Sequence, residues 1–185
     1  MTPRRIGPLG FVFTALATLF LCNPATAEYE AYLVFDQGQT PIVGQLTTPD
    51  GVEEAIAVTE FHHLVRREPN PGGCGGCDPY TPPQHRPLVV TTPVGMSTAQ
   101  LFQAFTNGDL VDVTLKLYGT GQQGLELKFE ITLQEGLIVA IEPVSLTTNG
   151  AVYEYQKLRF IYRTLIVSDA ATGLDMQWQL PSWPF

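Results

Sequence analysis

Two stretches in the middle of the chain alternate so regularly between apolar and polar residues that they constrain the fold class. The first reads LVDVTLKLYG from Leu110, and the second reads LELKFEITL from Leu125. A period of two places every second side chain on the same face of an extended strand, so each stretch predicts a strand with one face toward a core. The linking GTGQQG predicts a hairpin loop. The chain is therefore expected to build an antiparallel β structure around this pair.

Other segments continue the pattern on both sides of this hairpin. They have β-type composition and are bounded by glycine, proline and aspartate turn signals. These predicted strands cover residues 30–36, 40–46, 53–67, 86–95, 135–146, 152–167 and 174–180. The segment 152–167 is unusually long for one strand, so a bulge or bend is expected in it. Together they predict a mainly β fold, a small antiparallel barrel or sandwich of about eight strands.

One short helix interrupts the strands, in the stretch STAQLFQAFTNG. Ser97 is a natural N-cap, and Gln100 three residues later completes a capping box. Gly108 predicts a left-handed end to the helix. The apolar stripe of this helix comprises Leu101, Phe102 and Phe105. A helix this short is not stable alone, so we expect the stripe to be buried against the sheet.

A loop rich in proline and glycine is predicted at residues 68–85, and it contains Cys74 and Cys77 in the stretch GGCGGCD. If the chain is exported, as its N-terminus indicates below, these cysteines lie in an oxidising compartment. Such a compartment favours a disulfide between them, within one chain or between subunits. Two alternatives stay open. A redox-active pair is one, although such a CxxC usually opens a helix. A metal site is the other, although the spacing to His62, His63 and His85 matches no standard zinc finger. We expect no bound cofactor.

The N-terminus has the layout of a secretory signal peptide over residues 1–27. Arg4 and Arg5 precede a short apolar run, and Ala25-Thr26-Ala27 is a small-x-small cleavage site. The run is too short to span a bilayer comfortably. We therefore expect a single domain at residues 28–185, exported to the periplasm or the extracellular space, without stable membrane insertion after cleavage.

Charge and motifs narrow the function classes. The mature part keeps all 18 acidic residues and loses Arg4 and Arg5 from the ten basic ones, which gives a formal charge of −10. Such a chain repels nucleic acid. We find no GxSxG, HExxH or phosphate-binding glycine loop. The pair Glu126 and Glu130 lies on the solvent face of its strand, where carboxylates are usually solvated. We expect no enzyme activity.

The order of these elements resembles the Hcp family, the tube subunits of type VI secretion systems. The likeness runs from about residue 32 to residue 180 and rests on several stretches together. The strongest is RPLVVTTPVGMSTAQLFQAFTNGDLVDVTLKLY, which joins a strand, the capped helix and the alternating strand. The long strand followed by DAATG and a tryptophan-containing strand also fits. No single motif is diagnostic, but the order and spacing of all of them is fairly specific.

The resemblance implies a small β-barrel with one flanking helix, shared with phage tail-tube proteins. Family members form hexameric rings that stack head to tail into a hollow tube. The partner implied is the protein itself, with other secretion or surface proteins as further partners. In the family, the loop that corresponds to residues 68–85 reaches the neighbouring ring. The family normally lacks a signal peptide, whereas one is predicted here. This chain is therefore expected to be an exported relative that still assembles into rings.

Strands with apolar residues on both faces must be covered twice, and ring closure would supply the second cover. The candidate subunit interface therefore comprises Glu60, His62, Tyr153, Tyr155, Ile161 and Arg163. Each of these positions is alternatively an ordinary surface or core position. A second function class stays open beside the self-assembling ring. It is a secreted monomeric binding module that reuses the barrel, with the 68–85 loop as the ligand or partner site.

Overall fold

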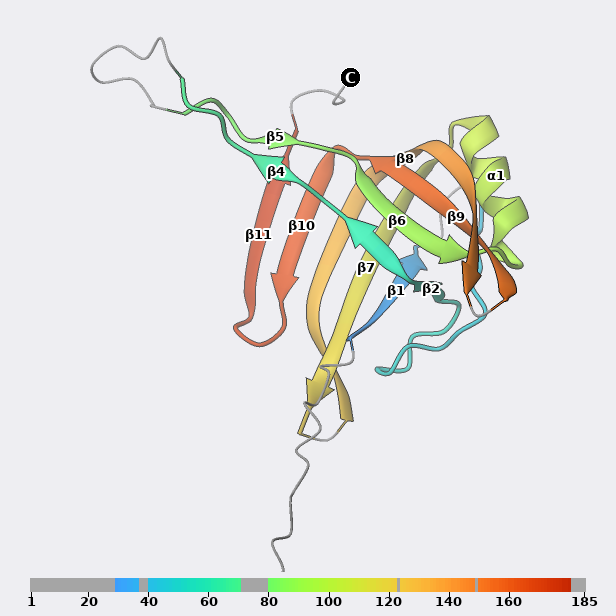
Figure 1. Ribbon diagram of the computed structural model, residues 1–185. Coiled ribbons are helices and arrows are strands. Elements are labelled where there is room, and N and C mark those ends of the chain that lie inside the picture. Colours follow the sequence, from blue (N-terminus) through green and yellow to red (C-terminus); the bar gives the residue numbers. More distant parts are fainter. Residues whose placement is uncertain (1–28, 37–39, 71–79, 123, 149, 181–185) are drawn as a thin grey trace, which may run out of the picture.

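The computed structural model describes residues 29–36, 40–70, 80–122, 124–148 and 150–180, and shows a curled antiparallel sheet with one helix packed against it (Figure 1). The strands are β1 Tyr29–Phe35, β2 Ile56–Val58, β3 Glu60–His62, β4 Val65–Arg66, β5 Gln84–His85, β6 Leu88–Pro93, β7 Leu110–Gly121, β8 Gly124–Thr148, β9 Ala151–Ile161, β10 Thr164–Asp169 and β11 Leu174–Gln179; the helix α1 is Ser97–Asn107. The expected signal peptide, Cys74 and Cys77 lie outside the described residues. The predicted mainly β fold with one short helix is confirmed.

The main sheet has nine strands in the order β2-β1-β7-β8-β9-β6-β3, with β10 joining β8 to β11. The two ends of this path, β2 and β3, are consecutive in the chain and separated by Thr59 alone. The Thr59 amide donates to the Thr91 carbonyl oxygen at 2.9 Å. The sheet therefore curls round until its ends meet through the backbone, without a continuous hydrogen-bonded ladder across the junction.

The alternation that predicted β7 and β8 is confirmed where the two strands cross the body. Val113, Leu115 and Leu133 are fully buried, while Thr114 and Thr132 lie on the opposite face and share a 3.0 Å hydrogen bond. We call the face that carries the buried residues the core face and its opposite the outer face. The core cluster draws on most strands and on α1; its largest members include Leu33, Leu88, Leu101, Leu158, Phe160, Tyr162 and Leu165.

Four of the strand predictions differ from the structure. Residues 40–46 form no strand, and only Leu46 among them makes an isolated bridge, to Ala55. The segment 53–67 is three short strands, because the chain changes partner from β1 to β6 at Thr59 and then leaves the sheet for β5. The segments at 125 and 135 are one strand, β8, which turns at Glu135 with a φ of 49° instead of ending. The long strand at 152–167 breaks at residues 162 and 163 into β9 and β10. Both strands pair with β8, but the other neighbour changes from β6 for β9 to β11 for β10.

The predicted N-terminal cap of α1 is wrong. Met96 occupies the N-cap position with helical dihedral angles and no side-chain cap. Ser97 is the first helical residue and is buried, while the Gln100 side chain accepts a hydrogen bond from the Val43 amide at 2.9 Å. Thr98 Oγ1 instead accepts the Gly95 amide. The Gln100 side chain therefore bonds to a residue 57 positions away in the chain instead of capping its own helix. The local sequence could not predict this contact.

The end of α1 matches the prediction. Gly108 lies at the C-cap with φ 68° and ψ 34°, and its amide donates to the carbonyl oxygens of Ala104 and Phe105. Residues with a Cβ adopt this left-handed conformation only at a cost, so the backbone geometry favours glycine here.

We expect Gly108→Ala to lower the free energy of unfolding by about 1 kcal/mol, because the Cβ is strained at positive φ although no atom lies close enough to clash. Urea unfolding followed by circular dichroism measures this change. Gly95→Ala is the matched control, because a Cβ there meets only the end of the Gln45 side chain at 3.4 Å. Equal losses in the two variants would contradict the assigned role of Gly108.

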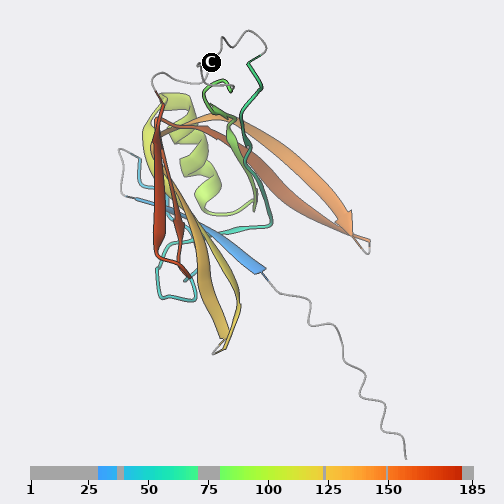
Figure 2. The same ribbon diagram turned by 90° about the vertical axis from the view of Figure 1, so that its left-hand side faces the viewer.

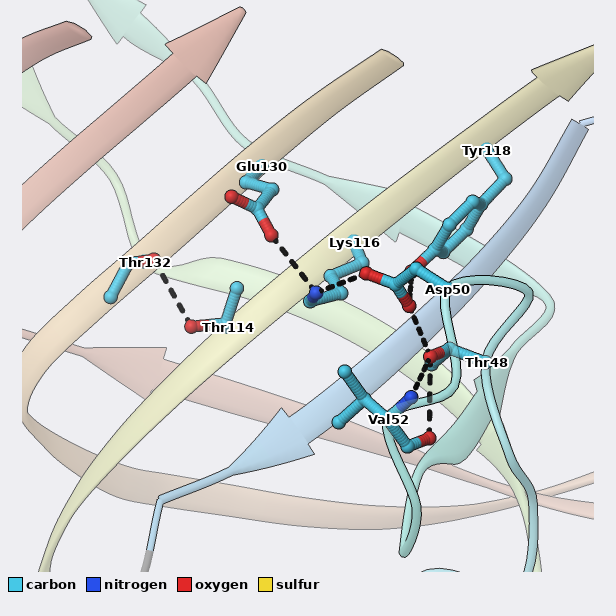
Figure 3. A network of polar contacts seen from close by, with 8 residues as sticks. All are labelled: Thr48, Asp50, Val52, Thr114, Lys116, Tyr118, Glu130 and Thr132. Atoms are coloured by element: carbon cyan, nitrogen blue, oxygen red, sulfur yellow. Dashed lines mark hydrogen bonds and ion pairs between the residues drawn. The ribbon is translucent and has the colours of Figure 1, made fainter. Parts of the chain in front are cut away.

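A polar network holds the turn at residues 48–52 against the outer face of β7 (Figure 3). Asp50 accepts hydrogen bonds from Lys116 Nζ at 2.7 Å and from the Tyr118 hydroxyl at 2.5 Å. Thr48 also donates to Asp50, and Lys116 pairs with Glu130 at 3.2 Å. Tyr118 is fully buried although it lies on the outer face. The turn therefore covers this part of the outer face and fixes the segment that leads into β2.

The network shifts the titration of its members. Burial tends to raise the pKa of Asp50, but hydrogen bonds from Lys116, Thr48 and Tyr118 outweigh burial and hold that pKa well below its ordinary value. Burial lowers the pKa of Lys116, yet its hydrogen bonds to Asp50 and Glu130 raise it overall. Burial and the bond to Asp50 raise the pKa of Tyr118 to about 12. All three shifts favour the charged pair with a neutral tyrosine at neutral pH.

Candidate subunit interface

A hairpin arm formed by residues 142–148 of β8 and 151–155 of β9 projects from the body of the molecule (Figure 2). Residues 138–148 of β8 pair only with β9 among the described strands, since β7 and β10 pair with the first half of β8. An isolated two-stranded hairpin is marginally stable in water. The arm is therefore a segment that gains from packing against something beyond the described part of its own chain.

The outer face of the arm is apolar at its tip. In the register of β8 and β9, Leu146 lies opposite Tyr153 and Val144 lies opposite Tyr155. Opposite residues in an antiparallel pair share a face, and so do residues two apart, so these four side chains form one patch. Leu146 and Tyr153 are each 49% exposed, and Val144 and Tyr155 are half-buried. We call these four residues the arm patch.

The arm patch lies on the side of the sheet opposite the core. Residues 156, 158 and 160 of β9 are buried on the core face, and Tyr153 and Tyr155 have the opposite parity. Further toward the body the same outer face carries charges, including Glu142 and Arg159 paired at 2.9 Å. Both of these side chains are nearly half exposed, so their pairing stabilises the fold little. An apolar centre beside a charged margin is typical of protein interfaces.

The structure brings four of the six predicted interface residues onto this one face. Glu60 lies opposite Thr91, which lies opposite Lys157 of β9. His62 is two residues from Glu60 and is also exposed, so both share the outer face with Tyr153 and Tyr155. A shallow hollow lies beside Glu60 and His62 on this face. The outer face of β3, β6 and β9 is thus continuous with the arm patch.

The other two predicted residues do not belong to this surface. Ile161 is 2% exposed and is part of the interior of the single chain, so the prediction is wrong there. It has the same parity in β9 as Tyr153 and Tyr155, but it is buried. Arg163 is exposed and pairs with Glu135 at 3.1 Å near the bend of β8. It lies beyond the end of β9, away from the arm.

A second exposed apolar surface lies on α1, where burial was expected. Leu101 is fully buried, but Phe102 is 44% and Phe105 is 38% exposed. The helix covers the core face, because Gln156 on that face donates from Nε2 to Thr98 Oγ1 at 3.2 Å. Only Ser97, Leu101 and Ala104 of the helix are buried. The expected burial of Phe102 and Phe105 is therefore wrong, because one narrow stripe of small residues and Leu101 makes the contact.

The arm patch and the phenylalanines of α1 lie on opposite sides of the sheet. Figure 2 shows α1 on one side of the molecule and the arm directed to the other. A head-to-tail interface needs two different surfaces on each copy that do not overlap. The molecule therefore has the two kinds of surface that such an interface requires.

The strand β11 offers a third exposed site. It has a ladder partner, β10, on one side only among the described strands. Leu174 is 66% and Met176 is 53% exposed on this edge. An edge strand with exposed apolar side chains is open to pairing with another chain.

Sequence reasoning missed Val144, Leu146 and the exposure of the helix phenylalanines. The segment EPVSL was read as apolar on both faces, although Val144 and Leu146 alternate with polar Ser145 and Thr147. Their alternation alone predicts a shared face; it does not show that this face is the outer one.

No group of three or more histidine, cysteine, aspartate or glutamate residues in the described part of the chain could hold a metal ion. None of the helices described is long and apolar enough to cross a membrane.

The comparisons with known proteins agree with this geometry. The sequence model of the family described as "Type VI secretion system effector, Hcp" matches residues 32–165. No curated protein sequence matches the chain. Three solved structures share its fold, with each comparison covering most of both chains. A crystal structure of an Hcp protein superposes with a TM-score of 0.69 at 22% identity, over 83% of this chain and 100% of that one. A mutant of Hcp1 from the E. coli EAEC 042 pathovar gives 0.67 at 17% identity, over 81% and 97%. Hcp3 from Pseudomonas aeruginosa, described as a secreted protein, gives 0.65 at 22%, over 84% and 100%.

Proposed function

The chain belongs to the Hcp family of type VI secretion proteins, and from this membership we propose that it is a structural subunit that assembles with copies of itself into hexameric rings. The rings stack into a hollow tube or an extracellular filament. The protein has no catalytic role in this proposal. Its partner is a second copy of the chain, and other secretion or surface proteins contact the assembled ring.

The observation that carries this proposal is the pair of apolar surfaces on opposite sides of one sheet. The arm patch of one copy would contact a different surface of the next, in a heterologous interface. Such contacts close into a ring when the rotation between copies allows it. Leu146 and Tyr153 are about half exposed in the single chain, so burying the rest of each would contribute on the order of 1 kcal/mol per side chain.

Export is the second part of the proposal. It rests on the signal peptide expected at residues 1–27, with the mature chain acting in the periplasm or outside the cell. In that compartment a disulfide between Cys74 and Cys77 would persist and would stiffen the contact between stacked rings.

The experiment is the assembly state of residues 28–185, purified under oxidising conditions. Mass in solution is measured by light scattering beside negative-stain electron microscopy, across a range of protein concentrations. Rings or tubes of uniform width with a hexamer mass are expected. A monodisperse monomer at high concentration would overturn the proposal and favour the monomeric binding module, whose ligand would then be sought at residues 68–85.

A further inference from the structure

Two histidines share one buried tyrosine hydroxyl at the junction of β9 and β10. His63 Nε2 lies 2.7 Å from the Tyr162 hydroxyl oxygen, and His85 Nδ1 lies 3.2 Å from the same atom. Tyr162 is 1% and His85 is 8% exposed. The two imidazole ring centres are 6.4 Å apart, and Trp178 of β11 lies 6.0 Å from the ring of His85. The ring contacts and hydrogen bonds thus join four residues from four parts of the chain.

The two histidines are at the base of a two-stranded ribbon that leaves the main sheet. We call residues 63–70 and 80–86, which include β4 and β5, the β4–β5 ribbon; Figure 1 shows it reaching past the ends of β10 and β11. Its ladder pairs only Val65 with His85 and Arg66 with Gln84, with an isolated bridge further out. The Arg86 amide also donates to the Leu64 carbonyl oxygen at 2.9 Å. A ribbon this small is not stable by its own pairing.

Side-chain packing does little to hold the ribbon in place. Leu64 and Val65 are about two-fifths exposed, and Tyr80 is half exposed. Within β4 and β5, His85 is the only buried side chain. The contacts of His63 and His85 with Tyr162, with the ring contact between His85 and Trp178, attach the base of the ribbon to the body through buried or half-buried side chains.

The hydroxyl can use both its donor and its acceptor function within the cluster only while one of the two histidines is neutral. A tyrosine hydroxyl donates one hydrogen bond and accepts others, and a neutral imidazole has one donor and one acceptor nitrogen. The hydroxyl oxygen could accept from both imidazoles, but the hydroxyl hydrogen would then find no partner in the cluster. The hydrogen is satisfied when one imidazole donates to the hydroxyl and the other accepts from it. Protonating the accepting imidazole turns its nitrogen into a donor and leaves the buried hydroxyl hydrogen without a partner. An unsatisfied buried donor is costly, and so is a buried charge.

The groups around the pair do not offset that charge. Tyr162 faces the histidines from the β9–β10 junction, Trp178 from β11 and His62 from β3. Arg86 follows His85 in the chain, Arg163 follows Tyr162, and Arg66 lies three residues after His63. All three side chains are cationic, so they do not compensate a positive charge on a histidine. The acidic Glu68 is paired with Arg66 at 2.5 Å, and Glu135 with Arg163 at 3.1 Å.

We propose that the His63–Tyr162–His85 cluster is an acid-sensitive latch, which holds the base of the β4–β5 ribbon on the body at neutral pH and releases it when the histidines are protonated. The contacts lie within one chain, so the latch does not depend on ring assembly. A monomeric result in the assembly experiment would leave it standing.

The direction of the titration agrees with this geometry. Burial, with smaller contributions from His85 and His62, lowers the pKa of His63 from 6.5 to about 4. Burial also lowers the pKa of His85. The latched state thus binds fewer protons than the released state, whose histidines titrate near 6.5. The latch is fully stable above pH 6.5 and weakens as the pH falls from 6.5 toward 4.

Amide hydrogen exchange of residues 28–185, followed by NMR with EDTA present, tests the latch. After correction for intrinsic exchange, the opening constant reported by the Arg86 amide should rise on the order of 50-fold between about pH 7.5 and about pH 4.5, from the His63 shift alone. The amides of the β6–β9 ladder should not change over this range. EDTA ensures that loss of a bound metal cannot produce the response.

Two variants sharpen the result. His63→Gln keeps a donor and an acceptor but does not titrate, so most of the pH response should disappear. His62→Gln is the matched control, because His62 is adjacent and exposed, and it should keep the full response. An unchanged Arg86 amide at low pH, or a full response in His63→Gln, would overturn the latch. If His63→Gln does not fold, the pH titration of the His63 ring proton chemical shifts is measured in the wild-type protein instead. A midpoint near 6.5 for His63 would overturn the latch.

Discussion

Replacing Leu146 and Tyr153 together by aspartate is expected to abolish self-assembly while leaving the single chain folded. The two side chains lie opposite each other on the outer face of the arm and are each 49% exposed. Assembly would bury them, so the variant both removes apolar area and places two charges in the interface. Burying unpaired charges is strongly unfavourable. We therefore expect a loss of more than about 100-fold in association affinity, since each 1.4 kcal/mol changes the affinity about tenfold.

The measurement is mass in solution by light scattering, with far-ultraviolet circular dichroism and thermal unfolding as the test of folding. The matched control is the pair Thr147→Asp and Val152→Asp, which also lie opposite each other but on the other face of the arm. Both variants place like charges across the same hairpin, so both weaken the arm itself equally. Assembly that survives in the first variant, or is lost equally in both, would contradict the role of the arm patch.

Asp50→Ala is expected to lower the free energy of unfolding by about 2 kcal/mol at neutral pH. The change removes the carboxylate partner of the buried Tyr118 hydroxyl and one of the two carboxylates paired with the nearly buried Lys116, which keeps Glu130. Removing one member of a fully buried pair costs about 3–5 kcal/mol, and the 35% exposure of the Asp50 side chain reduces that value. Glu53→Ala is the control in the same loop, where an exposed residue should matter by less than about 0.5 kcal/mol.

The Asp50 contribution also has a defined pH dependence. The carboxyl has a lower pKa in the folded protein than its ordinary 3.8, so the folded state binds fewer protons. Its stabilising contribution is complete above the unfolded value and is lost as the pH falls below about 3.8. Urea unfolding of wild type and variant between about pH 7 and pH 3 should therefore give a constant difference that shrinks only in the most acidic samples. A difference that grows in acid would contradict the network.

The sequence predicted those features that local pattern controls. The alternation of β7 and the first half of β8 appears in the structure, and Gly108 ends α1 because its backbone angles favour glycine. The errors arise where distant contacts override a local pattern. The Gln100 side chain bonds to the Val43 amide instead of capping its own helix. The segment 53–67 is interrupted because its partner strands lie in different parts of the chain.

The candidate interface was predictable in part for the same reason. Tyr153 and Tyr155 were identified from their strand, but Leu146 joins them only through the register of β8 with β9. Ile161 has the same parity as these tyrosines, but it is buried. His62 and His63 are adjacent, but His62 is exposed on the outer face while His63 contacts the Tyr162 hydroxyl, because β3 ends between them. Sequence periodicity carries no information on any of these contacts.

The place of β1 in the sheet affects when the fold can form. Tyr29–Phe35 pairs with β2 and with residues 113–119 of β7, and it supplies fully buried Leu33 to the core. Among the described strands, β1 is the first to be synthesised, and its short ladder with β2 joins residues 23 to 27 apart in the chain. Its longer ladder with β7 joins residues 78 to 90 apart, and forming such non-local pairs is slow. The core that β1 contributes to therefore cannot be completed until β7 has been synthesised. That delay is what a protein needs if it must pass through a narrow export channel before it acquires its structure.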